Sequence, residues 1–257
     1  DERFNGIVFK HWRAQLRLVP RRGTGPIAIE DSGPLINSLR LVKSPEELTL
    51  MRRAADLAVE AHNLAREMAR PGRYEYEIQA EMEYIFSKAG GGPAYPSIVA
   101  SGGNSCILHY VENTRQLQEG DLLLIDAGCC YQYYNSDITR TFPVSNKFTP
   151  EQKIIYEIVL EAQKQAIAKI KPGTPYNEHH DAAVRVIVEG LMSLGLLVGE
   201  IEEIVKEEKY KPFFMHKTGH WLGLDVHDVG NYKYNEESWQ VLQPGYILTV
   251  EPGIYIS

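Results

Sequence analysis

The sequence has few of the features that mark secreted, membrane or metal-thiolate proteins. It contains three cysteines in 257 residues, Cys106, Cys129 and Cys130, and this odd number without zinc-finger spacing indicates neither a disulfide framework nor a thiolate metal site. No apolar run approaches the ~20 residues of a membrane span, and the first residues lack the layout of a signal peptide. We therefore expect a cytoplasmic protein without a membrane partner.

An excess of positive charge is absent as well. The formal net charge is -7 at pH 7, which argues against nucleic acid as a partner because phosphate binding relies on a basic face. The arginines in residues 13–22 are typical of a solvated face or a linker rather than of a binding patch. With 44% hydrophobic and 24% charged residues, the composition is that of a globular protein, and the length suits one main domain.

The two ends of the chain predict a piece of a longer protein. It opens without a methionine and stops directly after a strong motif, so we expect a cut at both ends. Turn signals at residues 21–26 and 32–34 predict an irregular segment. We interpret residues 1–41 as the remnant of an N-terminal domain plus a linker, and residues 42–257 as the main domain.

Four helices are predicted, and two of them have strong start signals. Ser44 as N-cap, Pro45 at the first helical position and Glu47 as the partner in a capping box predict a helix start. Thr149 and Gln152 repeat this arrangement later in the chain. The apolar spacing and the stop signals then predict helices over residues 44–68, 76–88, 149–170 and 177–194.

Strand-like runs follow each pair of helices, which suggests an internal duplication. The clearest match pairs residues 120–128 with residues 245–253, since each puts one carboxylate after an apolar run and two residues before a glycine. The acidic segment 199–209 is predicted to be a solvated excursion. The predicted strands cover residues 97–101, 121–127, 129–134 and 138–144, with further strands at residue 213 and residues 247–251.

The densest chemistry lies in residues 215–228, MHKTGHWLGLDVHD, which hold His216, His220 and His227. A histidine cluster alone does not fix a reaction, so its meaning depends on partners elsewhere in the chain. Asp126 is such a partner, because a carboxylate that ends a Leu-Leu-Leu-Ile run is poorly solvated and must be paired, protonated or bound to a metal.

Asp137 follows at an odd separation, so a hairpin would place it opposite Asp126 at ~5 Å, where the two charges repel. A shared proton, an arginine such as Arg140, or bound cations would relieve that repulsion. Glu251, at the parallel place of the second repeat, favours cations. With His220, the set of Asp, Asp, His and Glu suits manganese, cobalt, iron or zinc in a two-metal hydrolase with ions ~3.5 to 4 Å apart.

Four motifs resemble one family: IDAG at 125–128, SDITRTF at 136–142, HKTGHWLGLDVHDVG at 216–230 and TVEPGIY at 249–255. From about residue 41 onward, the chain resembles the catalytic domain of the aminopeptidase P family, most closely the bacterial kind. This family shares the pita-bread fold with prolidase, creatinase and methionine aminopeptidase. The resemblance implies an α+β fold with two pseudo-symmetric helix-helix-strand halves around a curved, mainly antiparallel sheet.

The resemblance also implies a site and a reaction. The ligands of two divalent ions, with manganese as the first choice, would be Asp126, Asp137, His220 and Glu251. The residues acting on the substrate would be His109, His216, His227 and again Glu251. Asp137 would bridge the ions, and Glu251 would help to activate the metal-bound water. The resulting hydroxide would attack the carbonyl before a proline at the second position of a peptide.

Two departures from the family pattern matter. The family's fifth ligand is a glutamate in an Arg-Ile-Glu-Asp type segment, and these 257 residues contain no such segment after TVEPG. We therefore predict that the chain alone binds metal weakly and lacks full activity. The family's N-terminal domain contributes to oligomerisation and to selection of substrate length, so a homo-oligomer remains open for the full-length protein.

Several alternatives remain beside a metal-dependent Xaa-Pro aminopeptidase. Prolidase takes only dipeptides and stays open, although HWLGLDVHDVG favours the aminopeptidase. Creatinase works without metal and lacks the carboxylate ligands, and non-catalytic pita-bread modules that bind proteins lose the ligand set. For Cys129 and Cys130, packing is favoured over thiol chemistry because no general base is suitably spaced. Residues 101–105 lack the ending of a phosphate loop and are interpreted as a turn leading to His109.

Overall fold

The computed structural model describes residues 2–256, which form one compact unit up to Ile36 and another from Asn37 onward. The prediction of an irregular segment before residue 41 is wrong, because helices occupy most of it. Pro20 lies in the first turn of one short helix, and Gly23, with φ 71°, caps its end. Pro20 and Gly23 thus mark helix boundaries, whereas Gly25 and Pro26 lie in the stretch 24–31, which is irregular as predicted. The helices are α1 (Glu2–Leu16), α2 (Val19–Arg22) and α3 (Gly33–Leu41).

The four predicted helices are confirmed, and both capping boxes form. The Ser44 hydroxyl accepts the Glu47 amide proton at 3.3 Å, and the Glu47 carboxylate accepts the Ser44 amide proton at 2.7 Å. Thr149 and Gln152 exchange the same two bonds at 3.2 and 3.0 Å. The helices are α4 (Pro45–Met68), α5 (Glu75–Lys88), α6 (Pro150–Lys169) and α7 (Glu178–Ser193).

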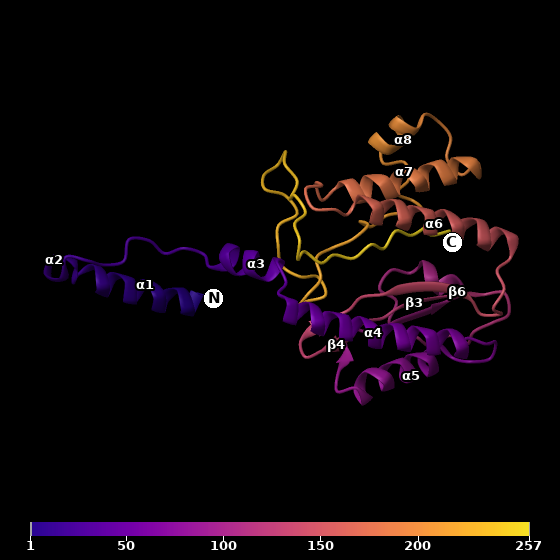
Figure 1. Ribbon diagram of the computed structural model, residues 1–257, viewed down its shortest axis with the longest axis horizontal. Coiled ribbons are helices and arrows are strands. Elements are labelled where there is room, and N and C mark those ends of the chain that lie inside the picture. Colours follow the sequence, from indigo (N-terminus) through magenta and orange to yellow (C-terminus); the bar gives the residue numbers. More distant parts are fainter. Residues whose placement is uncertain (1, 257) are drawn as a thin grey trace. The chain divides into compact units, whose positions relative to one another are not determined.

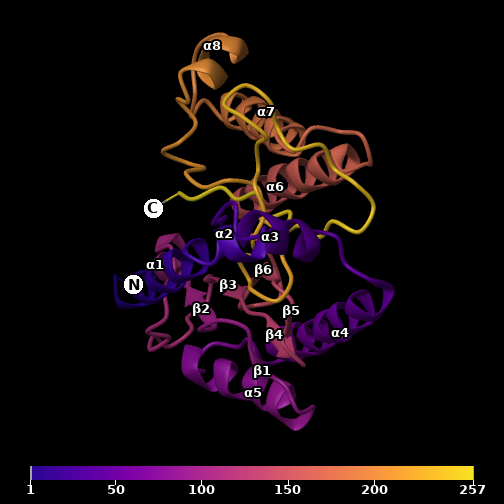
Figure 2. The ribbon, with the colours of Figure 1, turned by 90° about the vertical axis from the view of Figure 1, so that its left-hand side faces the viewer.

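The helices pack as two pairs on opposite sides of the strands. Figures 1 and 2 show α4 and α5 on one side of β3 and β6, with α6 and α7 on the other. Each pair has its own apolar core. Phe86 and Ile125 are fully buried in the first core, and Ile187 and Phe214 in the second. This arrangement supports two halves of the predicted helix-helix-strand kind.

The strands of the first half form two small antiparallel sheets, in the orders β2-β3-β6 and β1-β4-β5. The predicted pairing of Asp126 with Asp137 is wrong, since the register places Thr139 opposite Asp126. The chain between them forms its own hairpin, whose turn residues Gln132 and Tyr133 have φ of 48° and 73°. The strands are β1 (Gly92–Pro93), β2 (Ile98–Ser101), β3 (Leu122–Asp126), β4 (Cys129–Tyr131), β5 (Tyr134–Asn135) and β6 (Thr139–Pro143).

The second half departs from the predicted strands. Residue 213 lies in a turn, and over 247–251 only Leu248 forms a bridge, with Trp221. Backbone hydrogen bonds from Leu222 to Ile247, Thr249 to His220 and Glu251 to Thr218 still hold residues 218–222 and 247–251 side by side. The apolar pattern of 247–251 therefore reflects the pairing with residues 218–222 and the packing of Val250 against the core formed by α6 and α7.

The acidic segment 199–209 is largely exposed, as predicted, but it is anchored in the core, and this part of the prediction is corrected. It contains the helix α8 (Ile201–Lys206), whose Ile204 is fully buried in the core of the second half. The acidic side chains cover the outer face. Because they outnumber the apolar residues in this segment, the sequence pattern gave no sign that Ile204 is buried. In the part of the chain that the structure describes, no helix is long and apolar enough to cross a membrane.

Candidate metal centre

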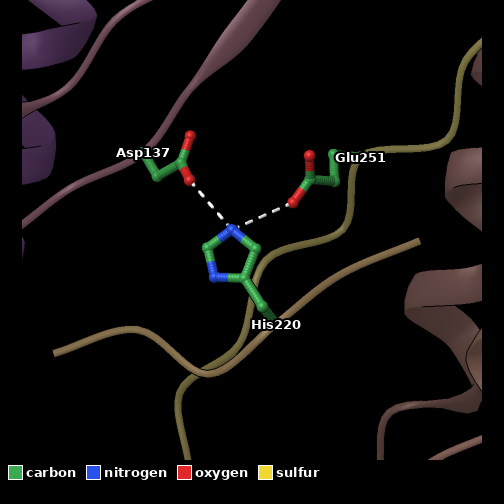
Figure 3. Close-up of side chains that lie close together, drawn as sticks. All are labelled: Asp137, His220 and Glu251. Carbon is green, nitrogen blue, oxygen red and sulfur yellow. Dashed lines mark ion pairs between the residues drawn. The ribbon is translucent and has the colours of Figure 1, made fainter. Parts of the chain in front are cut away.

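Three side chains from distant parts of the chain meet at one point (Figure 3). His220 Nε2 lies 3.1 Å from Asp137 Oδ2 and 3.2 Å from Glu251 Oε1. One oxygen or nitrogen from each residue lies within 4.8 Å of the other two. Asp137 precedes β6, while the hydrogen-bonded segments 218–222 and 247–251 supply the other two residues. The exposed fractions of the side chains, 12%, 15% and 32%, leave the group partly open.

Asp126, at the end of β3, adjoins this group through a tyrosine. The Tyr95 hydroxyl lies 2.5 Å from Asp126 Oδ1 and 2.8 Å from Asp137 Oδ1. Its single proton satisfies one carboxylate at a time. Burial and the negative charge of Asp137 raise the pKa of Asp126 to about 7. Both carboxylates thus adjoin one hydroxyl, and either a proton or a cation near them would relieve their repulsion.

The His220 imidazole lies between the carboxylates of Asp137 and Glu251. Burial alone lowers the pKa of His220, but hydrogen bonds with Asp137 and Glu251 outweigh it and raise the pKa to about 10. The ring Nδ1 lies 2.9 Å from the Trp221 carbonyl oxygen, which accepts its proton. Nε2 therefore faces the carboxylates, and a cation that replaces its proton meets one nitrogen and several carboxylate oxygens. This donor set fits a divalent transition-metal ion.

The remaining predicted histidines line the same cavity, which has a volume of about 1480 Å³. His216 Nε2 lies 2.8 Å from the Tyr255 hydroxyl, and the His227 ring centroid lies 4.4 Å from that of His220. His109 lies on the cavity wall with an unusual backbone φ of 56°. The predicted site residues that line this cavity are His109, Asp126, Asp137, His216, His220, His227 and Glu251.

The structure adds residues that sequence reasoning missed. Thr249 and Tyr255 stand inside the TVEPGIY motif, but only their contacts with Glu251 and His216 show that they support the site. Tyr95 belongs to no motif near the carboxylates in sequence, and no local signal could have found it. Arg140, a candidate partner for the carboxylate pair, instead donates a hydrogen bond to the Thr139 carbonyl.

The model of metallopeptidase family M24 matches residues 49–257, most of the chain. The chain belongs to metallopeptidase family M24. As a member of this family, it is 47% identical over 235 residues to the Xaa-Pro aminopeptidase of Escherichia coli K12, covering 91% of this chain and 53% of that protein. It is also 47% identical over 230 residues to the Xaa-Pro aminopeptidase of Haemophilus influenzae, covering 89% of this chain and 53% of that one.

Solved structures agree with this M24 membership. The Pseudomonas aeruginosa aminopeptidase PepP matches with a TM-score of 0.92 at 48% identity, covering 100% of this chain and 58% of that one. Zinc-substituted E. coli aminopeptidase P in complex with product matches with a TM-score of 0.87 at 46% identity, covering 95% of this chain and 56% of that one. The α+β pita-bread fold is therefore confirmed. The chain spans about half the length of the curated relatives it matches.

Thr249 is expected to tune the metal affinity of this M24 site. Its hydroxyl accepts the His220 amide proton at 2.9 Å and donates to Glu251 Oε1 at 2.7 Å. Replacing Thr249 with valine keeps the shape but removes this link, so the affinity for Mn²⁺ should fall about 10- to 100-fold, as for other outer partners of metal ligands. Calorimetric titration of the Thr249→Ser protein, which keeps the hydroxyl, should give a value near wild type. A valine variant that binds as tightly as wild type would contradict this role.

Proposed function

We propose that the protein is a metal-dependent aminopeptidase that hydrolyses the bond between an N-terminal residue and a following proline. The observation that carries this proposal is the meeting of Asp137, His220 and Glu251, beside Asp126, in a cavity that also contains His216 and His227. The names of its relatives support the specificity for proline, since two curated proteins of 47% identity are Xaa-Pro aminopeptidases.

We propose that two divalent ions bind among the side chains of Asp126, Asp137, His220 and Glu251. Manganese is the first choice for both ions. Bound ions would supply Lewis acidity toward a carbonyl oxygen and would ionise water near neutral pH. The donor set supports this, because neighbouring carboxylates repel one another and a bound cation relieves that repulsion. Zinc in the E. coli relative shows that another divalent ion enters the centre of that protein.

The protein's own groups would then bind the peptide and move protons. Glu251 carries the carboxylate suited to accept a proton from the attacking water. It is held in place by Thr249 through one oxygen, at 2.7 Å. His227, packed against His220, is suited to donate to the scissile carbonyl oxygen and to the oxyanion that develops on it. His109, which also lines the cavity, would contact the substrate.

Both ring nitrogens of His216 have hydrogen-bond partners, which the sequence motif did not predict. Its Nδ1 lies 2.8 Å from the Lys217 carbonyl oxygen, so Nδ1 carries the proton. Its Nε2 then accepts the proton of the Tyr255 hydroxyl, whose pKa burial and nearby carboxylates raise to about 12. We propose that His216 and Tyr255 act as a pair on the substrate side. The Tyr255 proton is held by His216 Nε2, so the hydroxyl would have to turn from His216 toward the tetrahedral intermediate in order to steady it.

An assay of the whole protein separates this proposal from its alternatives. A tripeptide with proline second should be cleaved to a free residue and a peptide that begins with proline. A chelator should abolish the cleavage, and added Mn²⁺ should restore it. Cleavage of Xaa-Pro dipeptides alone would indicate a prolidase, and cleavage of neither substrate in the metal-loaded protein would indicate a non-catalytic binding module.

Three broader assignments remain proposals. Cysteine usage supports a cytoplasmic location, and we propose peptides with proline at the second position as the partners. We also propose that residues 1–41 connect to, and include part of, an N-terminal domain, whereas residues 42–257 carry the catalytic fold.

A further inference from the structure

Glu75, the first residue of α5, has a fully buried carboxylate that the proposed reaction does not use. A carboxylate without contact to water is costly unless several donors satisfy it. The first turn of a helix offsets part of that cost, since the helix dipole favours negative charge there. The hydrogen-bond partners of Glu75 show what this buried charge achieves.

Five donors surround the carboxylate, and all of them come from residues 101–115. Glu75 Oε1 accepts bonds from the Ser101 amide and hydroxyl, both at 2.7 Å, and from Asn104 Nδ2 at 3.2 Å. Glu75 Oε2 accepts bonds from the Tyr110 hydroxyl at 2.8 Å and the Arg115 amide at 2.9 Å. The Glu75 amide in turn donates to the Arg115 carbonyl at 3.0 Å. One side chain therefore ties together both ends of a single loop.

This loop carries His109 into the cavity. Between the Glu75 partners Asn104 and Tyr110, the chain lines the cavity with Ser105, Cys106, Ile107, Leu108 and His109. Tyr110 directly follows His109 and is 7% exposed, so the histidine stands one residue from a buried anchor. His109 has φ 56°, a left-handed conformation that residues other than glycine seldom adopt. Such a conformation persists where the surrounding contacts enforce it.

We propose that Glu75 is a positioning residue that holds His109 at the substrate side of the cavity by fixing the loop on both sides of it. The inference rests on the proposed function for the role of His109. Glu75 itself does not face the metal ligands, because its side-chain contacts are all with the loop. Its loss should therefore change turnover without changing metal binding.

Glu75→Gln in the whole protein tests this directly. The amide keeps the shape but places an NH₂ group against donors, so kcat/KM for a tripeptide with proline second should fall about tenfold or more. The affinity for Mn²⁺ should stay within about twofold, since residues 101–115 contain no proposed ligand. Glu77→Gln is the matched control, because Glu77 lies on the same helix and accepts only from the exposed Tyr74 amide and Arg73.

A double-mutant cycle with His109→Ala distinguishes positioning from a general loss of structure. If Glu75 acts through His109, adding Glu75→Gln to the His109→Ala protein should cause little further loss of kcat/KM. The same tenfold loss in both backgrounds would overturn the proposal. Where Glu75→Gln does not fold, Tyr110→Phe removes a single hydroxyl of the same cluster and serves in the same cycle.

Amide hydrogen exchange provides a readout that does not depend on catalysis. Glu75→Gln should speed exchange over residues 101–115, whereas Glu77→Gln should leave it unchanged. Unchanged exchange in Glu75→Gln would overturn the proposal even if the enzyme were active. A wild-type protein that cleaves no Xaa-Pro peptide would instead count against the proposed function, while the exchange result would still decide whether Glu75 holds the loop.

Discussion

If His220 is a ligand of the proposed metal centre, replacing it with alanine is expected to remove the metal and leave the fold intact. His220 Nε2 is the atom that lies between Asp137 and Glu251, at 3.1 and 3.2 Å. Without it, the carboxylates face one another with no imidazole donor. The loss in Mn²⁺ affinity should exceed the roughly 10- to 100-fold that removal of an outer partner causes. Elemental analysis after dialysis of the whole protein, alongside its melting temperature, measures both expectations.

The matched control is His227→Ala. The His227 ring packs against His220 at 4.4 Å between centroids, yet it lies outside the candidate metal group of Asp137, His220 and Glu251. This variant should keep its metal and lose turnover by about 10²- to 10³-fold, the range for loss of one donor to a developing oxyanion. If His227→Ala lost the metal and His220→Ala kept it, the assigned roles of the two histidines would be reversed.

Asp228→Ala is expected to be the most destabilising single change outside the apolar core. Asp228 Oδ2 lies 3.0 Å from Lys43 Nζ, and both side chains are 1% exposed. Arg40 Nη2 contacts the other carboxylate oxygen. Alanine would leave the Lys43 ammonium buried without a counter-charge, which typically costs about 3–5 kcal/mol. The free energy of unfolding in urea, taken from midpoint and slope, measures this loss.

Asp225→Ala controls for the effect of removing any acid from the same loop. Asp225 also binds Arg40, at 2.7 Å, but its side chain is 63% exposed. Water screens such a pair, so the expected loss is at most about 1 kcal/mol. Similar losses for the two variants would mean that the buried position of Asp228 does not control the energy of this network.

Features that depend on neighbouring residues could be predicted from the sequence. Ser44 with Glu47, and Thr149 with Gln152, start helices through bonds that span three residues, so the local pattern suffices. The order of helices and apolar runs likewise predicted two halves. The four motifs predicted the family, and the matching family model confirms it. The sequence therefore predicted that carboxylates and an imidazole would be the metal ligands, before any distance was known.

How those donors meet became visible only in the folded chain. Thr139, not Asp137, stands opposite Asp126 because the intervening chain turns into a separate hairpin. Tyr95 reaches Asp137 across 42 positions and Glu75 reaches Arg115 across 40, so neither contact leaves a local pattern. Ile204 shows the same limit, since acidic neighbours mask its place in the core. Packing brings these side chains together although they lie far apart in the sequence. A local sequence pattern covers only neighbouring residues, so it cannot predict such contacts.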